Sequence, residues 1–372
     1  MTHLTERIIK IGRDCGFDLI GVTTNENFST SQEHAINQIS NGNMDGLTWY
    51  TPYRVLRGSD PTQLMPETQS IISVGINYYQ ESNSNNFTDA YIARYAQGRD
   101  YHRIIKKMIK DYVLRLESSL QSDIKAKWYV DDGPMLDKAV ANRSGLGWFG
   151  KNSNILSKTH GSWILLGEIL TDLKLTPNQP LQTSCGECTI CIDLCPTQAI
   201  SEPYLITNSK CISFHTIENR GTVPTNLRKS FGNWVFGCDI CQEVCPVNRF
   251  SKQHSSPDFD TTRTQTTIQN LLEMSEEEFR NQFSGTPVMR AKYDGMRRNA
   301  CIVAGNQVDN THLPGLSMCL GASDPVVRGH AAWALGQFST YETMEILKQA
   351  LTLEQDITVS KEINMALGLA ET

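Results

Sequence analysis

The stretch CGECTICIDLCP, residues 185–196, places four cysteines within twelve residues. A second stretch, CDICQEVCP at 238–246, adds three more. The first spacing, C-x2-C-x2-C-x3-C-P, is the one with which bacterial [4Fe–4S] sites are built, and its fourth cysteine ligates a neighbouring cluster. We therefore expect iron–sulfur clusters here. Structural zinc, which paired cysteines also bind, is the alternative.

The second stretch lacks a nearby first cysteine, and Cys211, upstream in NSKCISFH, can supply it. Exchanging the fourth ligands, as two-cluster ferredoxins do, completes both ligand sets. One set is Cys185, Cys188, Cys191 and Cys245, and the other is Cys195, Cys211, Cys238 and Cys241. The cysteines left over are expected to be core residues; these are Cys15, Cys301 and Cys319. Two adjacent clusters indicate transfer of single electrons.

The bulk composition restricts the protein class. The chain has 372 residues, a formal net charge of −6 and eleven cysteines. An odd number of cysteines in a chain of this size favours metal ligation in a reducing compartment over disulfides. The acidic balance argues against indiscriminate coating of nucleic acid but leaves room for a local basic face. Because there is no apolar leader and no run of about 18 apolar residues, we expect a cytoplasmic protein without a membrane span.

Residues 1–175 alternate short apolar runs with helical patterns. The runs FDLIGVTT, SIISVGINYY, KWYVDDG and GSWILLGEIL predict strands. Between Asp100 and Leu120 apolar residues recur at helical spacing, and Asp100 is placed to cap the start of that helix. This region is expected to be an α/β domain.

The C-terminal part contains an internal repeat. A shift of 31 residues lays RRNACIVAGN (297–306) over RGHAAWALGQ (328–337), so that Gly305 falls on Gly336. A weaker third copy, KEINMALGLA, contains Gly368. Two amphipathic helices per repeat indicate a short solenoid that resembles HEAT repeats.

Together these patterns predict an α+β multidomain protein. The expected domains are an α/β domain at 1–175, a bacterial-ferredoxin-like domain with two [4Fe–4S] clusters at 176–252, and a helical HEAT-like repeat domain at 265–372.

A candidate acid lies at the end of the third predicted strand, in Asp131-Asp132-Gly133-Pro134. A carboxylate at a strand end lies where α/β proteins usually bind ligands, and it could donate a proton if burial raised its pKa. The same four residues are also a common turn sequence. The downstream GLGWFGK matches neither a dinucleotide fingerprint nor a Walker loop, so its glycines are expected to let backbone approach a large flat ligand.

Several strings, in this order, resemble the epoxyqueuosine reductase family, whose members use cobalamin and iron–sulfur clusters in the last step of queuosine biosynthesis in tRNA. The resemblance covers nearly the whole chain. The strings are ARYAQGRDYH (93–102), VDDGPMLDKAVANRSGLGWFGKNSNIL (130–156), CGECTICIDLCPTQAI, CISFHTIENRG (211–221), FGNWVFGCDICQEVCP and the terminal repeats.

The resemblance implies an enzyme that reduces epoxyqueuosine, at the wobble position of a tRNA, to the alkene of queuosine with loss of water. It implies base-off cobalamin bound by the 1–175 domain and reduced by the nearer of two [4Fe–4S] clusters. The acid that protonates the departing oxygen is, by motif matching, Asp131. An electron donor of unknown identity has to supply the clusters, and we expect a monomer.

The same matching assigns further residues. Those expected to bind the cofactor are Arg57, Ala93, Lys151, Asn152, Ile155, Leu166, Ser213 and Asp239. Arg220 is expected at the mouth of the site, near the anticodon nucleotide. Two basic groups are expected to hold the anticodon stem by its phosphates: Arg94 and Lys107 with Arg99, Arg103, Lys106 and Lys110, and Arg297 and Arg298 with Arg290, Lys292 and Arg328. Without the resemblance, both groups would be interpreted as solvated helix faces.

Two other functions fit parts of the pattern. Respiratory reductive dehalogenases share the corrinoid and the two clusters, but they usually carry a twin-arginine signal and lack a HEAT-like tail. A plain iron–sulfur electron carrier would leave VDDGP and GLGWFGK unexplained.

Overall fold

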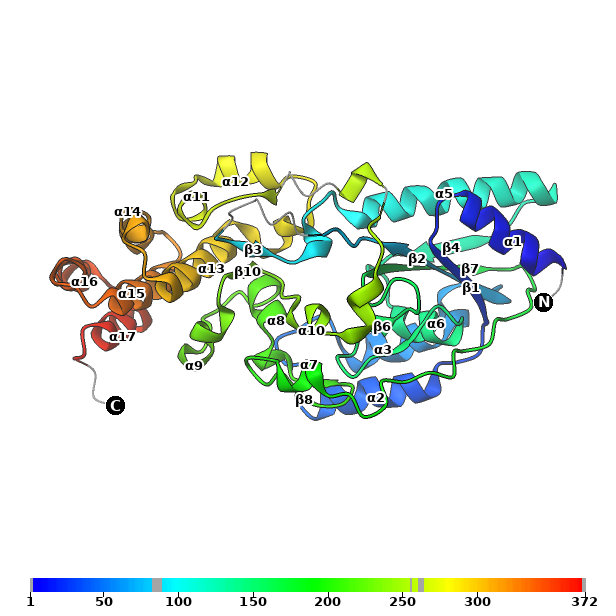
Figure 1. The fold of residues 1–372 in the computed structure, drawn as a ribbon, viewed down its shortest axis with the longest axis horizontal. Helices are drawn as coiled ribbons and strands as arrows, with labels where there is room; N and C mark the ends of the chain where they lie inside the picture. Colours follow the sequence, from blue (N-terminus) through cyan, green and yellow to red (C-terminus); the bar gives the residue numbers. More distant parts are fainter. Residues whose placement is uncertain (1–2, 82–88, 255, 260–263, 370–372) are drawn as a thin grey trace. The chain divides into compact units, whose positions relative to one another are not determined.

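The computed structural model describes residues 3–81, 89–254, 256–259 and 264–369. The chain forms two compact units, each assembled from segments that are distant in sequence (Figure 1). Unit 1 comprises Met1–Glu81, Asp100–Ser209 and Ile240–Phe259, and unit 2 comprises Ser82–Arg99, Lys210–Asp239 and Asp260–Thr372. Among the described helices, none has both the length and the apolar character needed to cross a bilayer.

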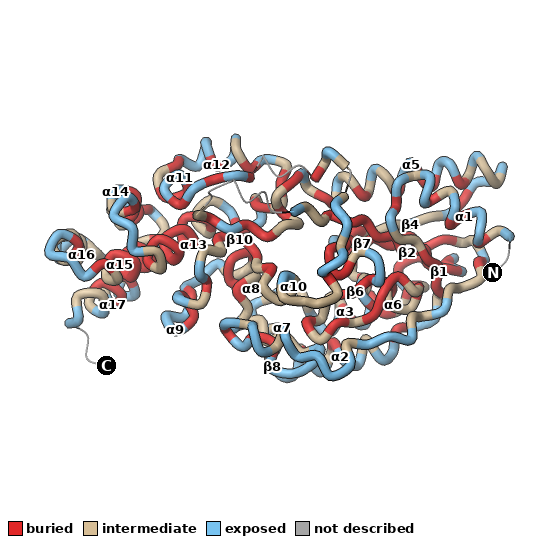
Figure 2. Tube along the Cα trace, in the orientation of Figure 1, coloured by how far each residue is buried: buried red, intermediate tan, exposed pale blue. Residues whose placement is uncertain are grey.

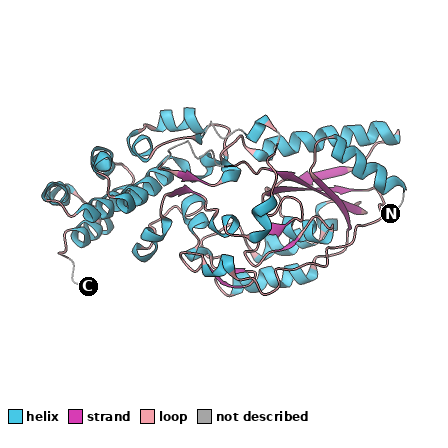
Figure 3. Ribbon diagram, viewed as in Figure 1, coloured by secondary structure: helices cyan, strands magenta, loops and turns pink. Residues whose placement is uncertain are grey.

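A four-stranded sheet forms the centre of unit 1 (Figure 3). Its strands follow the order β1-β2-β7-β4. The strands are β1 (Leu19–Thr24), β2 (Ser70–Asn77), β7 (Ile164–Thr171) and β4 (Ala126–Tyr129), so all four predicted strands are present. Every neighbouring pair is antiparallel. The sequence did not indicate these strand directions, because an apolar run alone does not reveal whether a strand is parallel or antiparallel.

Helices cover both faces of this sheet. α1 (His3–Asp14) and α5 (Tyr101–Leu120) pack on one face, and α6 (Asp137–Arg143) packs on the other. All residues of β2 are buried as a result (Figure 2). α5 begins where predicted, because the Asp100 side chain accepts a hydrogen bond from the main-chain N–H of His102 at 3.1 Å.

Shorter elements complete unit 1. They are α2 (Ser29–Ser40), α3 (Pro52–Ser59), α4 (Pro61–Leu64), the β5 (Trp148–Phe149) and β6 (Ile155–Leu156) hairpin, α7 (Ile190–Asp193), the β8 (Ile200–Glu202) and β9 (Leu205–Ile206) hairpin, and α10 (Ile240–Glu243). α7 and α10 are single turns that pack against each other. Each is followed by a Cys-Pro pair, where the proline stops the helix from continuing.

Unit 2 begins with a small parallel pair, β3 (Tyr91–Ile92) and β10 (Trp234–Phe236), on which α8 (Ile212–Ile217) packs. The main-chain N–H of Ala93 donates to the carbonyl of Phe236 at 2.8 Å. This pairing draws segment 89–99 out of the expected 1–175 domain, and the expected 176–252 segment is divided between both units. The two compact units are thus built from other segments than the three expected domains, and those domain bounds stay a prediction.

The helical repeat forms most of unit 2. Its central helices are α13 (Lys292–Gln307), α15 (Pro325–Phe338) and α17 (Ile357–Ala366), and its outer helices are α11 (Ile268–Glu273), α12 (Glu276–Phe283), α14 (Leu313–Leu320) and α16 (Tyr341–Leu353). The aligned glycines explain the period. A Cβ on Gly305 would lie 2.7 Å from the Trp333 ring, and one on Gly336 would lie 2.8 Å from the Ala366 Cβ. Each glycine thus lets the next central helix approach closely.

A buried ion pair ties the last helix to the rest of unit 2. Arg228 ends α9 (Thr225–Arg228) and its side chain is 0% exposed. Its Nη1 and Nη2 atoms donate to the two carboxylate oxygens of Glu362 at 2.9 and 2.5 Å. The remaining short elements are 3-10 turns at Arg94–Ala96, Asn208–Lys210, Lys229–Phe231, Pro246–Phe250, Pro257–Phe259, Pro287–Ala291 and Asn310–His312.

Candidate active site

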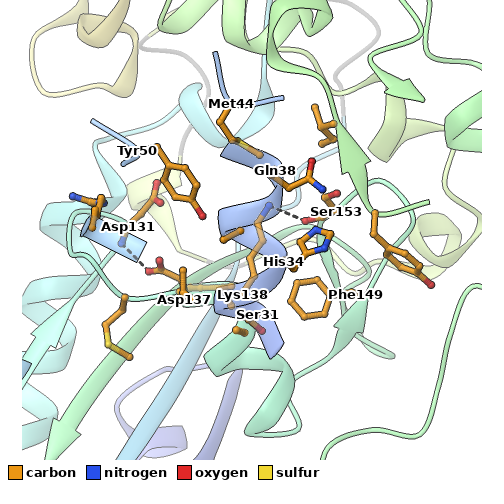
Figure 4. A pocket seen from close by; sticks show the side chains of 18 of the residues that line it. Ser31, His34, Gln38, Met44, Tyr50, Asp131, Asp137, Lys138, Phe149 and Ser153 are labelled. Carbon is orange, nitrogen blue, oxygen red and sulfur yellow. Dashed lines mark hydrogen bonds between the residues drawn. The ribbon is translucent and has the colours of Figure 1, made fainter. Parts of the chain in front are cut away.

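A cavity of about 890 Å³ opens beside the sheet of unit 1. Its walls come from α2, the start of α6, β7, the β8–β9 turn and the loop after β4. Most of its lining is apolar, and this volume is typical of sites for small molecules and cofactors. Figure 4 shows its polar groups, among them Asp131, Asp137 and Lys138.

Asp131 lies in the loop after β4 and lines this cavity. Its φ of 55° is left-handed, a conformation that costs a non-glycine residue about 1–2 kcal/mol. Two hydrogen bonds hold it there. The Tyr101 hydroxyl donates to Oδ2 of Asp131 at 2.5 Å, and the main-chain N–H of Asp131 donates to Oδ1 of Asp137 at 3.3 Å. Tyr101 itself is buried and stacks on His102, which fixes its ring.

The neighbouring Asp132 has different partners. Its carboxylate forms an ion pair with Lys106 and accepts the main-chain N–H of Val130 at 3.1 Å. Although burial acts to raise it, hydrogen bonds from Lys106 and Val130 hold the pKa of Asp132 below its ordinary value. A carboxylate kept ionised is a poor acid. Of the two aspartates, Asp131 is therefore the better candidate.

Two further carboxyl groups lie behind Asp131. Glu168 on β7 is 1% exposed and contacts Asp137, the first residue of α6. Burial, followed by the charge of Asp137, raises the pKa of Glu168 well above its ordinary value. Burial, followed by the charge of Asp131, raises the pKa of Asp137 to about 6. Like-charged groups so close together favour keeping a proton between them.

The nearby cations are engaged by other groups. Lys138 turns toward the β5–β6 loop, where its Nζ donates to the carbonyl of Ser153 at 2.8 Å (Figure 4). Arg54 donates to the carbonyl of Gly133 and stacks over the Trp49 ring at 5.0 Å. The charge of Lys138 still acts on Asp131 and Asp137, although its hydrogen bonds go to the β5–β6 loop.

The residues expected to bind the cofactor fall into different places. Leu166 lines the cavity, Ile155 is buried in β6, and Arg57 is exposed on α3. Ala93, Ser213 and Asp239 belong to unit 2, whereas the cavity belongs to unit 1.

Within unit 2, Ala93 and Asp239 are neighbours. The main-chain N–H of Arg94 donates to Oδ2 of Asp239 at 2.7 Å, and a Cβ on Gly237 would meet the Ala93 Cβ at 2.5 Å. Ser213 lies on α8. The structure thus groups two of the three residues, Ala93 and Asp239.

The β5–β6 hairpin connects the cavity wall with the cysteine segments. Phe149 at its start lines the cavity. Asn152 at its tip is buried, and its Nδ2 donates to the carbonyl of Cys241 at 3.1 Å. The carbonyl of Lys151 accepts the main-chain N–H of Tyr204 at 2.9 Å, and Tyr204 also lines the cavity. A ligand on this hairpin would therefore lie close to Cys241.

None of the eleven cysteines, which all lie among the described residues, forms a disulfide. Burial, followed by the charges of Cys245, Cys185 and Cys188, raises the pKa of Cys191 to about 11. The four sulfurs predicted for the first cluster are thus electrostatic neighbours. In the described part of the chain, no three His, Cys, Asp or Glu side chains converge as in a single-metal site, so the ligand assignment stays a prediction.

The second predicted set spans both units in sequence. Cys195 and Cys241 belong to unit 1, and Cys211 and Cys238 belong to unit 2. The Cys195 sulfur accepts the main-chain N–H of Ala199 at 3.3 Å, a contact that also tunes cluster sulfurs. Of the cysteines predicted to be core residues, Cys301 and Cys319 are fully buried, whereas Cys15 is half-buried.

Two of the expected tRNA contacts lie inside the helical repeat. Arg298 is 1% exposed, and its Nη1 donates to the carbonyl of Asn219 at 2.7 Å. Arg297 is 8% exposed, lies over the Tyr293 ring and donates to the Cys319 sulfur at 3.4 Å. Because both side chains are buried, they are poorly placed to contact phosphates directly. The sequence could not show this, since two adjacent basic residues do not reveal which side of the helix faces the core.

The other expected tRNA contacts are more accessible. Lys107 is exposed on α5, and Arg94 is half-buried. Arg220 is exposed, but its Nη1 donates to the carbonyls of Ile217 and Ala291 at 2.9 and 3.1 Å.

Sequence reasoning missed Tyr101, Asp137, Lys138 and Glu168 as site residues. A signal for Glu168 was present, because a single acid interrupts the apolar run ILLGEIL of a predicted strand. Asp137 and Lys138 lie within the quoted 130–156 string, but only the fold brings them to Asp131.

Three family models match successive parts of the chain. Residues 59–132 match "Epoxyqueuosine reductase QueG, DUF1730", residues 184–248 match "4Fe-4S double cluster binding domain" and residues 288–368 match "HEAT repeats". The predictions of an iron–sulfur segment and of HEAT-like repeats are thereby confirmed.

Named relatives agree with these matches. The epoxyqueuosine reductase of Synechocystis sp. is 43% identical over 243 residues, which cover 64% of this chain and 84% of the relative. That of Escherichia coli is 35% identical over 349 residues, which cover 91% of this chain and 90% of the relative.

Solved structures agree along almost the whole chain. A crystal structure of epoxyqueuosine reductase with an epoxyqueuosine-modified tRNA stem loop is 31% identical with a TM-score of 0.91, and covers 98% of both chains. A Bacillus subtilis structure, whose catalytic loop with an aspartate is swung out of the active site, is 30% identical with a TM-score of 0.90, and covers 99% of both chains. Similarity of this extent shows that the chain belongs to the epoxyqueuosine reductase family.

Proposed function

We propose that this chain reduces epoxyqueuosine in tRNA to queuosine in the cavity of unit 1, with Asp131 as the acid. The observation that carries the proposal is the position of Asp131, which lines the cavity on a left-handed loop and accepts the Tyr101 hydroxyl at 2.5 Å. In the Bacillus subtilis relative, a catalytic loop with an aspartate leaves the active site, and the loop of Asp131 would have the same role.

The acid would act on the oxygen of the epoxide. Opening the ring places negative charge on that oxygen, and a positioned carboxylic acid that protonates it accelerates such a step by about 10²–10⁴-fold. Tyr101 would orient the carboxyl group through its hydrogen bond. The largely apolar walls would exclude water from the reacting groups.

Base-off cobalamin is the cofactor proposed for this cavity. The apolar wall that includes Leu166 and Phe149 suits a broad apolar ring, and the adjoining hairpin reaches the cysteine segment through Asn152. When bound, cobalamin would supply electrons to an epoxide carbon. The proposed binding residues are Arg57, Ala93, Lys151, Asn152, Ile155, Leu166, Ser213 and Asp239.

The clusters would deliver those electrons one at a time. The double-cluster family match over 184–248 and the proximity of Cys191 to Cys185, Cys188 and Cys245 support the first ligand set. The second set, Cys195, Cys211, Cys238 and Cys241, rests on spacing alone. For the tRNA, Arg94, Lys107 and Arg220 remain the proposed contacts, since Arg297 and Arg298 are buried.

The proposal is tested with enzyme purified anaerobically and loaded with iron, sulfide and cobalamin. A tRNA bearing epoxyqueuosine and a chemical reductant are added, and the nucleosides are analysed by mass spectrometry. We expect queuosine to form. Loaded enzyme that leaves epoxyqueuosine unchanged would contradict the proposal.

The ligand assignment is tested by iron content. Cys188→Ala should lower the iron content from about eight atoms toward about four, because one of two [4Fe–4S] clusters loses a ligand. Cys301→Ala, a matched change in the buried repeat, should retain all of the iron. If Cys188→Ala still bound about eight irons, Cys188 would not be a ligand.

A further inference from the structure

Reduction of an epoxide to an alkene consumes more protons than one carboxyl group supplies. Both C–O bonds break, a C=C bond forms and the oxygen leaves as water, which takes up two electrons and two protons. Under the proposed function, Asp131 gives one proton in each cycle. A second proton has to reach it before the oxygen can leave as water.

We infer that Asp137 and Glu168 hold a shared proton behind Asp131 and return it to Asp131 during turnover. This inference rests on the proposed role of Asp131. No bond other than O–H bonds forms or breaks in this transfer: one carboxyl group of the pair loses a proton and the Asp131 carboxylate gains it. Asp137 and Glu168 act through Asp131 and are therefore positioning residues.

Asp137 contacts the main chain of Asp131 and the side chain of Glu168. It begins α6 and lines the cavity, and its Oδ1 accepts the main-chain N–H of Asp131 at 3.3 Å. On its other side it contacts Glu168, which is 1% exposed in the middle of β7. The Oε1 of Glu168 has no hydrogen-bond partner among the described residues. A charged carboxylate in that position would be costly, so the geometry favours a protonated pair.

The surroundings of the pair also favour a retained proton. Asp131 and Asp132 add negative charge from the loop after β4. Among the described residues no salt bridge joins a cation to either acid, because Lys138 donates to the Ser153 carbonyl and Arg54 to the Gly133 carbonyl. The charge of Lys138 still acts on Asp137, so the retained proton is favoured by burial and by the neighbouring acids. The titratable and charged groups around the pair are Tyr50, Arg54, Tyr101, Asp131, Asp132 and Lys138.

The direction of the pKa shifts agrees with this geometry. Burial, followed by the charge of Asp131, raises the pKa of Asp137 to about 6, and burial raises that of Glu168 well above its ordinary value. An ordinary carboxyl group has already lost its proton near neutral pH. The raised pKa values favour a proton on this pair at a higher pH than on an ordinary carboxyl group.

The first test is the pH dependence of turnover in the holoenzyme with excess chemical reductant. The wild-type rate should fall on the alkaline side as the pair loses its proton. Glu168→Gln should shift this alkaline fall in rate, the alkaline limb, to a pH about one unit lower. At pH values above the shifted midpoint, the variant should therefore be about tenfold slower than the wild type. Asp137→Asn should cause the same shift while keeping an acceptor for the Asp131 N–H. Glu67→Gln changes a glutamate paired with Lys125 on the surface and should leave the limb in place.

The second test does not depend on turnover. Infrared titration of the holoenzyme should show a protonated carboxyl band in the wild type near neutral pH that Glu168→Gln lacks. Because these acids have raised pKa values in the folded state, wild-type stability should also fall as the pH rises from their unfolded to their folded pKa values. Glu168→Gln should reduce that fall.

The outcomes separate the two proposals. If Glu168→Gln retains both the wild-type infrared band and the wild-type pH limb, the shared proton is refuted even when the enzyme is active. If the loaded wild-type enzyme does not convert epoxyqueuosine, the proposed function fails, and the infrared titration still decides whether the pair holds a proton.

Discussion

The cavity of unit 1 and the helical repeat of unit 2 both bury ionisable side chains, but they pair them in opposite ways. In the repeat, Arg228 donates to Glu362 at 2.9 and 2.5 Å, so opposite charges meet. Behind the cavity, Glu168 meets Asp137, so two acids meet. The first pair is a buried ion pair that joins α9 to α17, whereas the second favours holding a proton. Buried charge therefore serves stability in the repeat and is available for chemistry at the cavity.

The largest effect is expected at the cavity. Asp131→Asn should lower the rate of epoxyqueuosine reduction by about 10²–10⁴-fold, because the positioned acid is lost. The rate is measured by mass spectrometry of tRNA nucleosides, with the iron content and the bound cobalamin checked by absorption. Asp132→Asn is the matched control and should have a far smaller effect, since Asp132 pairs with Lys106 instead of lining the cavity. If the two variants turned over equally, Asp131 would not be the acid.

The next effect is expected in the repeat. Glu362→Leu should destabilise the protein by about 3–5 kcal/mol, because Arg228 is left charged and buried. The double change with Arg228→Met should recover most of this loss. Thermal unfolding of the holoenzyme measures both variants. Glu345→Gln, at an exposed pair with Lys348, should cost less than about 1 kcal/mol. A single variant as stable as the wild type would show that the pair does not hold α17 in place.

The smallest effect concerns the glycines of the repeat. Gly336→Ala should cost about 1–3 kcal/mol, because its Cβ would lie 2.8 Å from the Ala366 Cβ. Gly295 lies in α13, and a Cβ there would be 3.8 Å from the Ala291 Cβ, an ordinary contact. Gly295→Ala should therefore be neutral or stabilise the protein by up to about 1 kcal/mol. Thermal unfolding compares the two. Equal stabilities would mean that the helices can separate at no cost.

Local signals in the sequence predicted much of the fold. The four strands, the cap of α5 by Asp100 and the HEAT-like repeats were all found where expected. Each of these features depends on residues within one element or one repeat, so the spacing of residues along the sequence is enough to predict it. The direction of the strands and the division into two units were not predictable in this way, because they depend on pairs such as β3 with β10.

The candidate site divides along the same line. The sequence by itself determined the cysteine spacing of an iron–sulfur segment and singled out Asp131, because cluster ligands and motif residues are close together in the chain. Only the tertiary structure decided that Asp131 lines the cavity, that Asp137 and Glu168 lie behind it, and that Arg297 and Arg298 are buried. Burial and proximity set the charge that a side chain carries, and both arise from contacts between segments that are far apart in sequence.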